Sequence, residues 1–451
     1  MTDGEKFDEK YEKMTTAPVE RLVLDLAAPS IVIMLISAIY NTADTFFVGS
    51  LGTSAVAGVG VAFPLMAIIQ AIGFFFGHGA GNYVSRQLGA HKLDNASRMA
   101  ATGFISSIII GVCVTIAGIL LLERLAVFLG ATRTILPHAK SYLFYILLGT
   151  PWMTASLMLN SLLRFQGSAS YGMIGMVSGA VINIFLDPLL IYVLKMGVSG
   201  AAVATTASQF IGFCLLLKGC SSGGNIRIKP RDFSPNFSFY KEIVRGGIPS
   251  LLRQGLASVA TIYINRMAGG FGDAAIAAMS ITTRITLLAN STLLGIGQGF
   301  QPVCGFNYGA GAYDRVKRAF WFCIKISTVG LFLIAVLSCV YAPNIMAVFR
   351  SDDAQVIKIG SLALRLQFLV APLLGWVIMN NMMFQTMGKS ISASVMAMAR
   401  QGLFLLPLLF ILTPRLGLLG IQMSQPLSDI ATFILSIPLN VMIMRGMNTK
   451  P

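Results

Sequence analysis

Two aspartates, Asp44 and Asp187, lie within long apolar stretches of the sequence. Asp44 belongs to YNTADTFFVGSLG (residues 40–52), and 41 uncharged positions separate it from the next charged residue, Arg86. An ionised side chain at the centre of a membrane helix costs about 2.5–3.5 kcal/mol on insertion scales. Acids in such places are therefore candidates for function.

Other polar groups accompany these acids at helical spacing. Asn183 precedes Asp187 by four residues in GAVINIFLDPLLIY, so both side chains lie on one helix face. Pro188 follows and has no backbone N–H, which loosens the helical hydrogen bonds beside the acid. Tyr40 precedes Asp44 by four residues and shares its face.

Carboxylates, amides and hydroxyls on several helices suit a cation. Asn160 adds an amide from another helix, and ATTASQ (204–209) adds hydroxyls. Oxygen ligands suit Na⁺, and two buried carboxylates close together favour uptake of a proton. The pattern predicts a site for H⁺ or Na⁺, with a static hydrogen-bond network that locks the helices together as the alternative interpretation.

The elements that must position these residues are membrane spans. The chain is 55% hydrophobic and 11% charged, whereas soluble domains carry about 25% charged residues. Several uncharged intervals, such as 99–122, 141–163 and 366–388, have the length of about 20 residues that a transmembrane helix needs. Dividing the other apolar regions in the same way predicts twelve spans.

The net charge of +15 is explained by loop composition. With twelve spans and a cytoplasmic N-terminus, the cytoplasmic segments hold 20 Lys and Arg residues and the outer segments hold nine. This asymmetry predicts that both termini are cytoplasmic, and it accounts for the basic charge without a nucleic-acid partner. The first 21 residues are polar, so we expect no cleavable signal peptide.

The sequence repeats itself at an offset of about 220 residues. APSIVIML (28–35) matches IPSLLRQG (248–255), and GVSGAA (197–202) matches GLLGIQ (417–422). The longest polar interval separates the two copies. We expect five segments: a cytoplasmic tail over 1–20, a first lobe of six spans over 21–218, a cytoplasmic loop over 219–241, a second lobe of six spans over 242–445, and a cytoplasmic tail over 446–451.

The predicted fold is an all-α integral membrane protein with twelve transmembrane helices in two homologous six-helix lobes. Because six is an even number, both copies begin on the same side of the membrane, and the repeat is parallel with a pseudo-twofold axis. Duplicated folds of this kind are typical of carriers that alternate access to a substrate site. A channel would more often be an oligomer around a pore.

The second copy does not keep the acids. Asp44 aligns with Ile264, and Asp187 aligns with Leu408. Ion binding would therefore be concentrated in the first lobe. Arginines of the second lobe that face the substrate would disfavour a purely cationic substrate. The polar residues that we expect as substrate contacts of the second copy are Arg253, Gln254, Arg284, Arg400 and Asp429.

The sequence holds no phosphate-binding G-x-x-x-x-G-K-[ST] loop, no H-E-x-x-H zinc motif and no nucleophile elbow. We therefore expect neither ATP hydrolysis nor a cofactor. A membrane enzyme is the alternative from a different class.

Three motifs within the two copies resemble the multidrug and toxic compound extrusion (MATE) family, especially its DinF-like branch. They are LAAPSIVIMLISAIYNTADTFFVGSLG (26–52), SRQLGA (85–90) and NIFLDP (183–188). The resemblance extends from about residue 21 to residue 445. It implies two six-helix lobes arranged in a V and export of amphipathic, often cationic, compounds in exchange for H⁺ or Na⁺.

The resemblance also implies site residues. Pro29 stands where the family has a proline that lets the first helix bend, whereas the acidic second-lobe site of the NorM-like branch has no match, since SLLRQGLAS carries Arg253 and Gln254 there. Four residues would form the cation site, and would be the metal ligands if the ion is Na⁺, with Tyr40 and Asn160 nearby: Asp44, Asn183, Asp187 and Thr205.

The sequence thus predicts a multidrug efflux antiporter of a bacterial inner membrane, active as a monomer, whose partners are small organic substrates, H⁺ or Na⁺, and the lipid bilayer. Ion uptake at the first-lobe site would bend the first helix near Pro29 and release the substrate. A flippase for a lipid-linked saccharide and an exporter of anionic metabolites are the alternatives, because arginines near the substrate would favour them.

Overall fold

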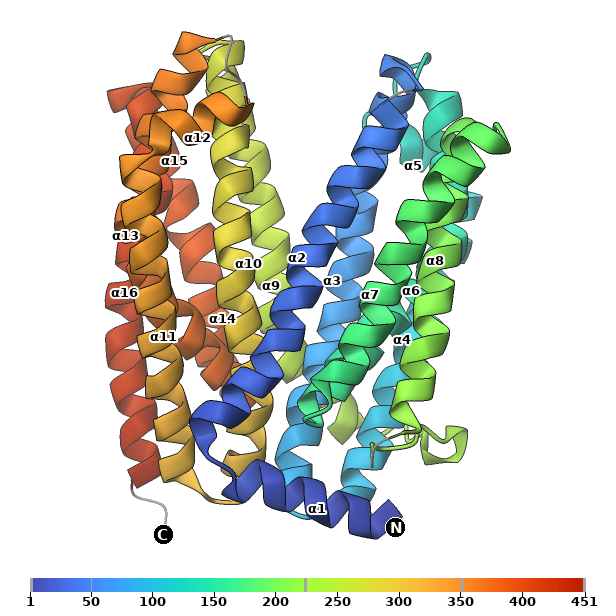
Figure 1. Cartoon of the computed structure of the whole chain (residues 1–451), viewed down its shortest axis with the longest axis vertical. Coiled ribbons are helices and arrows are strands. Elements are labelled where there is room, and N and C mark those ends of the chain that lie inside the picture. Colours follow the sequence, from blue (N-terminus) through green and yellow to red (C-terminus); the bar gives the residue numbers. More distant parts are fainter. Residues whose placement is uncertain (1–2, 50, 223–224, 350–352, 449–451) are drawn as a thin grey trace. The chain divides into compact units, whose positions relative to one another are not determined.

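The computed structural model of this chain describes residues 3–49, 51–222, 225–349 and 353–448. Within these ranges it describes every side chain except those of residues 3, 4, 6, 38, 41–46, 53, 273 and 448. The described part of the chain is helical and contains no β-strand (Figure 1).

The chain divides into two compact units, with unit 1 comprising residues 1–17 and 28–247, and unit 2 comprising residues 18–27 and 248–451. The helices up to residue 220 are α1 (Asp3–Thr16), α2 (Val19–Gly49), α3 (Thr53–Gly89), α4 (Leu93–Leu120), α5 (Leu122–Phe128), α6 (Leu136–Phe165), α7 (Ala169–Pro188), the π-helical turn η1 (Leu189–Val193) and α8 (Gly197–Cys220).

A short 3₁₀ turn, η2 (Pro230–Asp232), follows α8. The remaining helices are α9 (Phe237–Gly269), α10 (Asp273–Gly309), α11 (Tyr313–Val340), α12 (Ala342–Phe349), α13 (Ala354–Thr386), α14 (Ser390–Met398), the π-helical turn η3 (Ala399–Leu403), α15 (Leu405–Leu416) and α16 (Leu418–Asn448).

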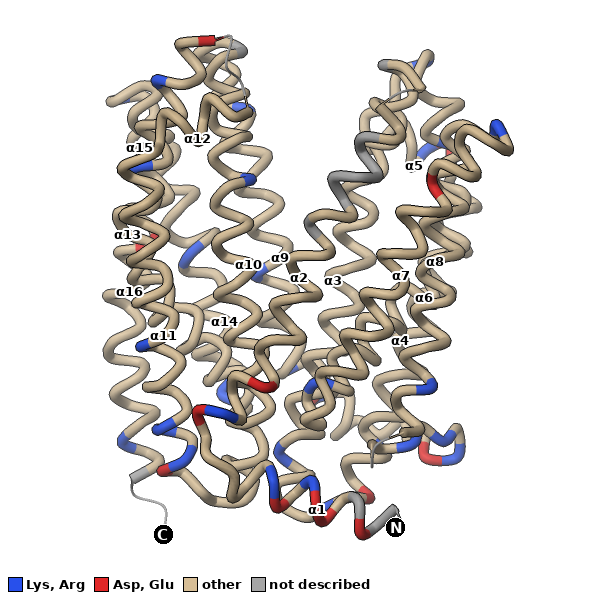
Figure 2. The backbone as a smooth tube through the Cα atoms, viewed as in Figure 1, with Lys and Arg blue, Asp and Glu red and all other residues tan. Residues whose placement is uncertain are grey.

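Length and composition make the long helices membrane spans. Nine helical segments among the described residues are long and apolar enough to cross a bilayer, and α2, α9 and α10 complete the predicted twelve-helix, two-lobe architecture, which is confirmed. In each unit the charged residues gather towards the ends of the helices, and the middle is largely uncharged (Figure 2). Helices suit this setting because they satisfy their backbone hydrogen bonds internally.

The two units repeat one packing plan. In unit 1, α6 is the central helix and packs against α3, α4 and α8; in unit 2, α13 is central and packs against α10, α11 and α16. Close packing in unit 1 depends on small residues: Gly73, Gly77 and Gly81 of α3 lie every four residues along one face. A Cβ atom at these positions would collide with α6, at Leu157, Ser161 and Phe165 in turn. Small residues at such spacing let membrane helices approach closely.

The first helix of each repeat is shared between the units. The boundary in α2 falls between Ala27 and Ala28, and the boundary in α9 falls between Gly247 and Ile248. The two boundaries are 220 residues apart, which is the offset of the sequence repeat. Pro29 lies two residues after Ala27, and Pro249 lies two residues after Gly247. The helical hydrogen bonding is therefore weakened where each helix passes from one unit to the other.

The N-terminal helix α1 lies across one end of the long helices of unit 1 (Figure 1). Its Met14 is 2% exposed, and its Tyr11 ring lies 3.7 Å from the ring of His91. The Lys10 Nζ donates hydrogen bonds to Ser168 Oγ at 2.6 Å and to Asn225 Oδ1 at 2.5 Å. Burial at this docking site lowers the pKa of Lys10 from 10.5 to about 7.

We predict that docking of α1 weakens as the pH falls from about 10 towards 7. In this range the docked state holds Lys10 neutral while the undocked state holds it charged, so the undocked state binds more protons and gains at lower pH. The docking equilibrium should change by at most about tenfold per pH unit. A spin label at the exposed Glu9, followed by electron paramagnetic resonance, should become more mobile as the pH is lowered from 9 to 7.

Lys10→Met should abolish this pH dependence, whereas Lys13→Met, which changes an exposed lysine of the same helix, should keep it. Equal label mobility at pH 9 and pH 7 in the unmodified protein would contradict the prediction.

Candidate functional site

The buried polar cluster of unit 1 is centred on Asp187. Asp187 is 0% exposed on α7, Asn183 is 1% exposed one turn before it, and Thr205 of α8 is 1% exposed. Of the two orientations of the Asn183 amide, one satisfies both of its ends: the nitrogen donates to Asp187 Oδ2 at 3.1 Å, and the oxygen accepts from the backbone N–H of Thr205 at 3.2 Å. One amide thus joins the acid to the neighbouring helix.

The helix that carries Asp187 changes its winding directly after the acid. α7 ends at Pro188, and the π-helical turn Leu189–Val193 follows. Pro188 has no N–H to donate, in agreement with the loosening that its position predicts. Wider π-helical turns occur frequently at functional sites, so the backbone beside Asp187 is the least regular part of this helix.

Asn160 of α6 lies in the same unit and is 7% exposed. Its side-chain oxygen lies against Gly172 of α7, where a Cβ atom would come within 2.5 Å of it. Among the described residues its amide has no hydrogen-bond partner. The structure therefore joins Asp187, Asn183 and Thr205 by hydrogen bonds and does not join Asn160 to them.

The remaining predicted residues of this site lie on α2. Pro29 and the half-buried Tyr40 belong to the part of α2 that is in unit 1. Residue 44 is also in this helix, but the side chain of Asp44 lies outside the described residues.

A second charged cluster is buried in unit 2, around Asp429 of α16. Asp429 is 0% exposed. Its Oδ1 accepts hydrogen bonds from Arg400 Nε at 2.8 Å and from Gln425 Nε2 at 2.9 Å, and its Oδ2 accepts one from Gln367 Nε2 at 3.1 Å. Three donors from three different segments therefore compensate the buried carboxylate, as a buried charge requires.

The other second-lobe residues singled out from the sequence are not part of this cluster. Arg253 Nη1 donates to Asn381 Oδ1 at 3.3 Å, Gln254 is half-buried, and Arg284 is exposed. Sequence inspection missed Gln367 and Gln425, because glutamines carry no charge that marks them in an apolar helix.

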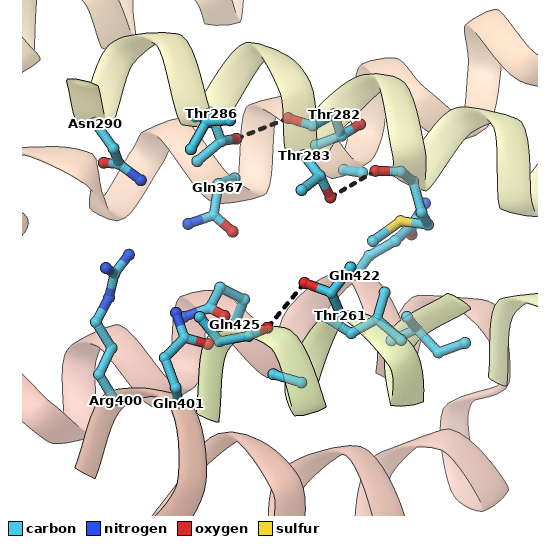
Figure 3. A pocket seen from close by; sticks show the side chains of 17 residues that line it. Thr261, Thr282, Thr283, Thr286, Asn290, Gln367, Arg400, Gln401, Gln422 and Gln425 are labelled. Carbon is cyan, nitrogen blue, oxygen red and sulfur yellow. Dashed lines mark hydrogen bonds between the residues drawn. The ribbon is translucent and has the colours of Figure 1, made fainter. Parts of the chain in front are cut away.

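A polar pocket of about 210 Å³ lies within unit 2 beside this cluster (Figure 3). Helix α10 lines one side with Thr282, Thr283 and Thr286, and the π-helical turn η3 presents Arg400 and Gln401 from the opposite side. Residues of α9, α13 and α16 complete the wall. The pocket thus belongs to one unit and is built by α9, α10, α13, the turn η3 and α16.

A duplicated twelve-helix membrane fold with buried charged clusters defines a membrane transporter. The MatE family model matches residues 29–189 and again residues 249–411, two segments whose starts are 220 residues apart. The chain belongs to this family, the MATE family of multidrug efflux transporters, and this confirms the family assignment made from the sequence.

Curated relatives support the assignment along nearly the whole chain. The sequence is 26% identical over 424 residues to the multidrug export protein MepA of Staphylococcus haemolyticus (strain JCSC1435), covering 94% of this chain and 93% of that protein. It is 27% identical over 430 residues to MepA of Staphylococcus aureus (strain NCTC 8325 / PS 47), with the same coverage.

A solved structure agrees at the level of the fold. The outward-facing conformation of a multidrug resistance MATE family transporter of the MOP superfamily matches with a TM-score of 0.91 and 27% identity, covering 97% of this chain and 98% of that chain. The relatives are transporters and not enzymes, and the protein is a multi-pass membrane protein.

We predict that Arg400 and Asp429 make coupled contributions to the free energy of unfolding. Removing one member of a buried pair costs about 3–5 kcal/mol, because the other charge is left uncompensated. Arg400→Gln should lower the unfolding temperature most, since it strands a carboxylate that is 0% exposed, whereas Asp429→Asn strands a guanidinium that is 17% exposed. The double variant should be more stable than either single variant.

The measurement is the unfolding temperature of the two single variants and the double variant, each purified in detergent. Arg284→Gln, which removes an exposed arginine of the same unit, is the matched control and should have little effect. Strictly additive effects of the two single substitutions would show that the pair is not coupled.

Proposed function

We propose that this protein exports small organic molecules in exchange for H⁺ or Na⁺ taken up at a site formed by Asp44 and Asp187 in unit 1. The observation that carries the proposal is the complete burial of Asp187 together with Asn183 and Thr205. Burial disfavours the ionised form of a carboxyl group, so a carboxyl group that is 0% exposed favours the arrival of a cation or proton.

The chemistry of the neighbours fits either ion. A Na⁺ ion needs several oxygen ligands, which carboxylates, an amide and a hydroxyl supply. A proton needs one carboxylate whose neutral form can donate a hydrogen bond to an adjacent acceptor. Asn160, whose amide makes no hydrogen bond with the described residues, offers a further ligand or acceptor in the same unit.

Helix α2 offers a route from ion uptake to a change of conformation. It begins within unit 2, continues in unit 1, and carries both Pro29 and Asp44. Because Pro29 cannot donate a helical hydrogen bond, bending costs less there than elsewhere in the helix. A change of charge at Asp44 alters how α2 packs in unit 1, and a bend near Pro29 would pass that change along the helix, as alternating access requires.

The excess of basic residues in the segments predicted to be cytoplasmic favours a cytoplasmic position for both termini. An inward cation gradient across the membrane would set the direction of exchange. The cation would then enter from outside and the organic substrate would leave, with the protein acting as a monomer in the inner membrane. The names of the MepA relatives favour drug-like substrates.

An exporter of anionic metabolites is the second candidate. The observation in its favour is the guanidinium of Arg400 beside the polar pocket of unit 2. Purified protein in liposomes should distinguish the two, by efflux of the organic cation ethidium and of an aromatic carboxylate under an imposed gradient.

We predict that Asp44→Asn and Asp187→Asn each reduce gradient-driven efflux at least about tenfold, because an amide can neither take up a proton nor compensate a metal cation. The measurement is efflux from proteoliposomes under a pH gradient at equal Na⁺, and under a Na⁺ gradient at equal pH. The gradient that drives efflux identifies the coupling ion.

Asp25→Asn is the matched control, because Asp25 is an exposed acid of the same helix and should be dispensable. Size-exclusion profiles should show that every variant is folded. Full transport by a folded Asp44→Asn protein would rule out the proposed coupling site.

A further inference from the structure

Part of the unit 2 pocket corresponds, in the sequence repeat, to part of the predicted cation site of unit 1, although Leu408, the counterpart of Asp187, does not line the pocket. At the offset of 220 residues, Tyr40 corresponds to Ala260, Asp44 to Ile264, and Thr205 to Gln425. Ala260, Ile264 and Gln425 all line the pocket. The second unit therefore has a pocket beside these positions and an apolar residue, Ile264, at the position of Asp44.

The charge that faces this chamber is positive. Asp429 directs both carboxylate oxygens at Arg400, Gln425 and Gln367, and is 0% exposed. Arg400 donates only through Nε; among the described residues, its two terminal nitrogens have no hydrogen-bond acceptor. The guanidinium reaches into the pocket from η3, towards the side on which Asn290 lies (Figure 3). It presents a fork of N–H donors, which matches the geometry of a carboxylate or another oxyanion.

The opposite wall offers acceptors. The hydroxyls of Thr282, Thr283 and Thr286 donate to backbone carbonyls one turn earlier in α10, at 2.8 to 2.9 Å. Their lone pairs remain available to a ligand O–H or N–H. Gln367 of α13 and Gln425, which lies on the same side as Gln401 (Figure 3), direct their amide nitrogens at Asp429, so their amide oxygens are acceptors as well.

The volume limits the ligand to a small molecule. An apolar cavity of about 150 Å³ accommodates benzene, so a pocket of about 210 Å³ accommodates one ring with one or two small substituents. The Arg400 guanidinium on one side and the α10 hydroxyls on the other select a ligand that has an oxyanion at one end and a hydroxyl at the other.

We propose that the unit 2 pocket, lined by Arg400 and the α10 threonines, binds a small hydroxylated carboxylate or similar oxyanion. The repeat thus holds two sites of opposite preference, a cation site in unit 1 and an oxyanion site in unit 2. This inference deepens the second candidate function, which rests on the same Arg400 guanidinium, but binding in unit 2 needs neither an ion gradient nor transport.

Three planar molecules of nearly equal shape test the charge preference: 4-hydroxybenzoate, 4-hydroxybenzamide and 4-hydroxybenzamidine, which are negative, neutral and positive. Binding to the purified full-length protein, in detergent and without a gradient, is measured by isothermal titration calorimetry. We expect 4-hydroxybenzoate to bind at least tenfold more tightly than the amide, and the amidine not to bind measurably.

Variants tie the preference to this pocket. The double variant Arg400→Gln/Asp429→Asn removes both charges together and should lose the preference for the anion. Thr286→Val should weaken the binding of 4-hydroxybenzoate several-fold. The binding of benzoate, which lacks the hydroxyl, should stay nearly unchanged. Arg415→Gln and Thr328→Val, an exposed arginine and a threonine of the same unit outside the pocket, are the controls and should bind like the unmodified protein.

Equal or tighter binding of the amidine would overturn the proposal, and so would an anion preference that survives in the double variant or the absence of binding by all three molecules. None of these results bears on ion coupling, which the Asp44 and Asp187 variants test separately. Loss of coupling without loss of 4-hydroxybenzoate binding would leave the unit 2 site standing alone.

Discussion

The cost of holding an ionised side chain in an apolar helical bundle governs both charged clusters of this protein. Asp187 and Asp429 are each 0% exposed, so each carboxylate depends on donors from the surrounding helices. Asp429 receives three donors, one of them charged, and is compensated within the folded chain. Asp187 receives an amide from Asn183 and has a hydroxyl residue, Thr205, on the next helix. The first carboxylate is a structural anion, and the second is the acid at which we propose uptake of a cation or proton.

The internal duplication separates what the fold needs from what the sites do. Each unit places a central helix, α6 or α13, among three neighbouring helices. The first helix of each repeat passes from one unit to the other beside a proline. Since Ile264 stands at the position of Asp44, the shared packing does not require an acid there. The acids of the first copy are thus additions to a scaffold that folds without them, as expected when function lies in sites carried by a fold.

The sequence predicted the spans and the repeat because both are long-range patterns. Uncharged intervals of bilayer length survive errors of a few residues, and an offset of 220 recurs at several anchors. It also predicted that Asn183 shares a face with Asp187, since four residues make about one turn. It did not predict which arginine of the second copy meets Asp429. Arg253, Arg284 and Arg400 look alike in sequence, and only the rotation of each helix about its axis separates them. The partners Gln367 and Gln425 were missed for a related reason, because an amide in a membrane helix is common enough to attract no notice.

The π-helical turns show why such rotations resist prediction. Each residue of an α-helix is rotated by about 100° about the helix axis relative to the residue before it. In η3 the backbone hydrogen bonds span one residue more than in an α-helix, which changes this rotation, and Arg400 and Gln401 of the turn line the pocket. The carbonyl of Arg400 accepts from Ser428 Oγ at 2.6 Å, which satisfies a backbone group at this turn. In unit 1 the turn η1 begins two residues after Asp187. The two turns start 210 residues apart, whereas the repeat has an offset of 220, so they are not equivalent positions of the shared fold. What they share is a charged residue at or beside the turn. In each unit the widened backbone thus lies at or beside a charged residue of the buried cluster, although the two turns occupy different positions of the repeat.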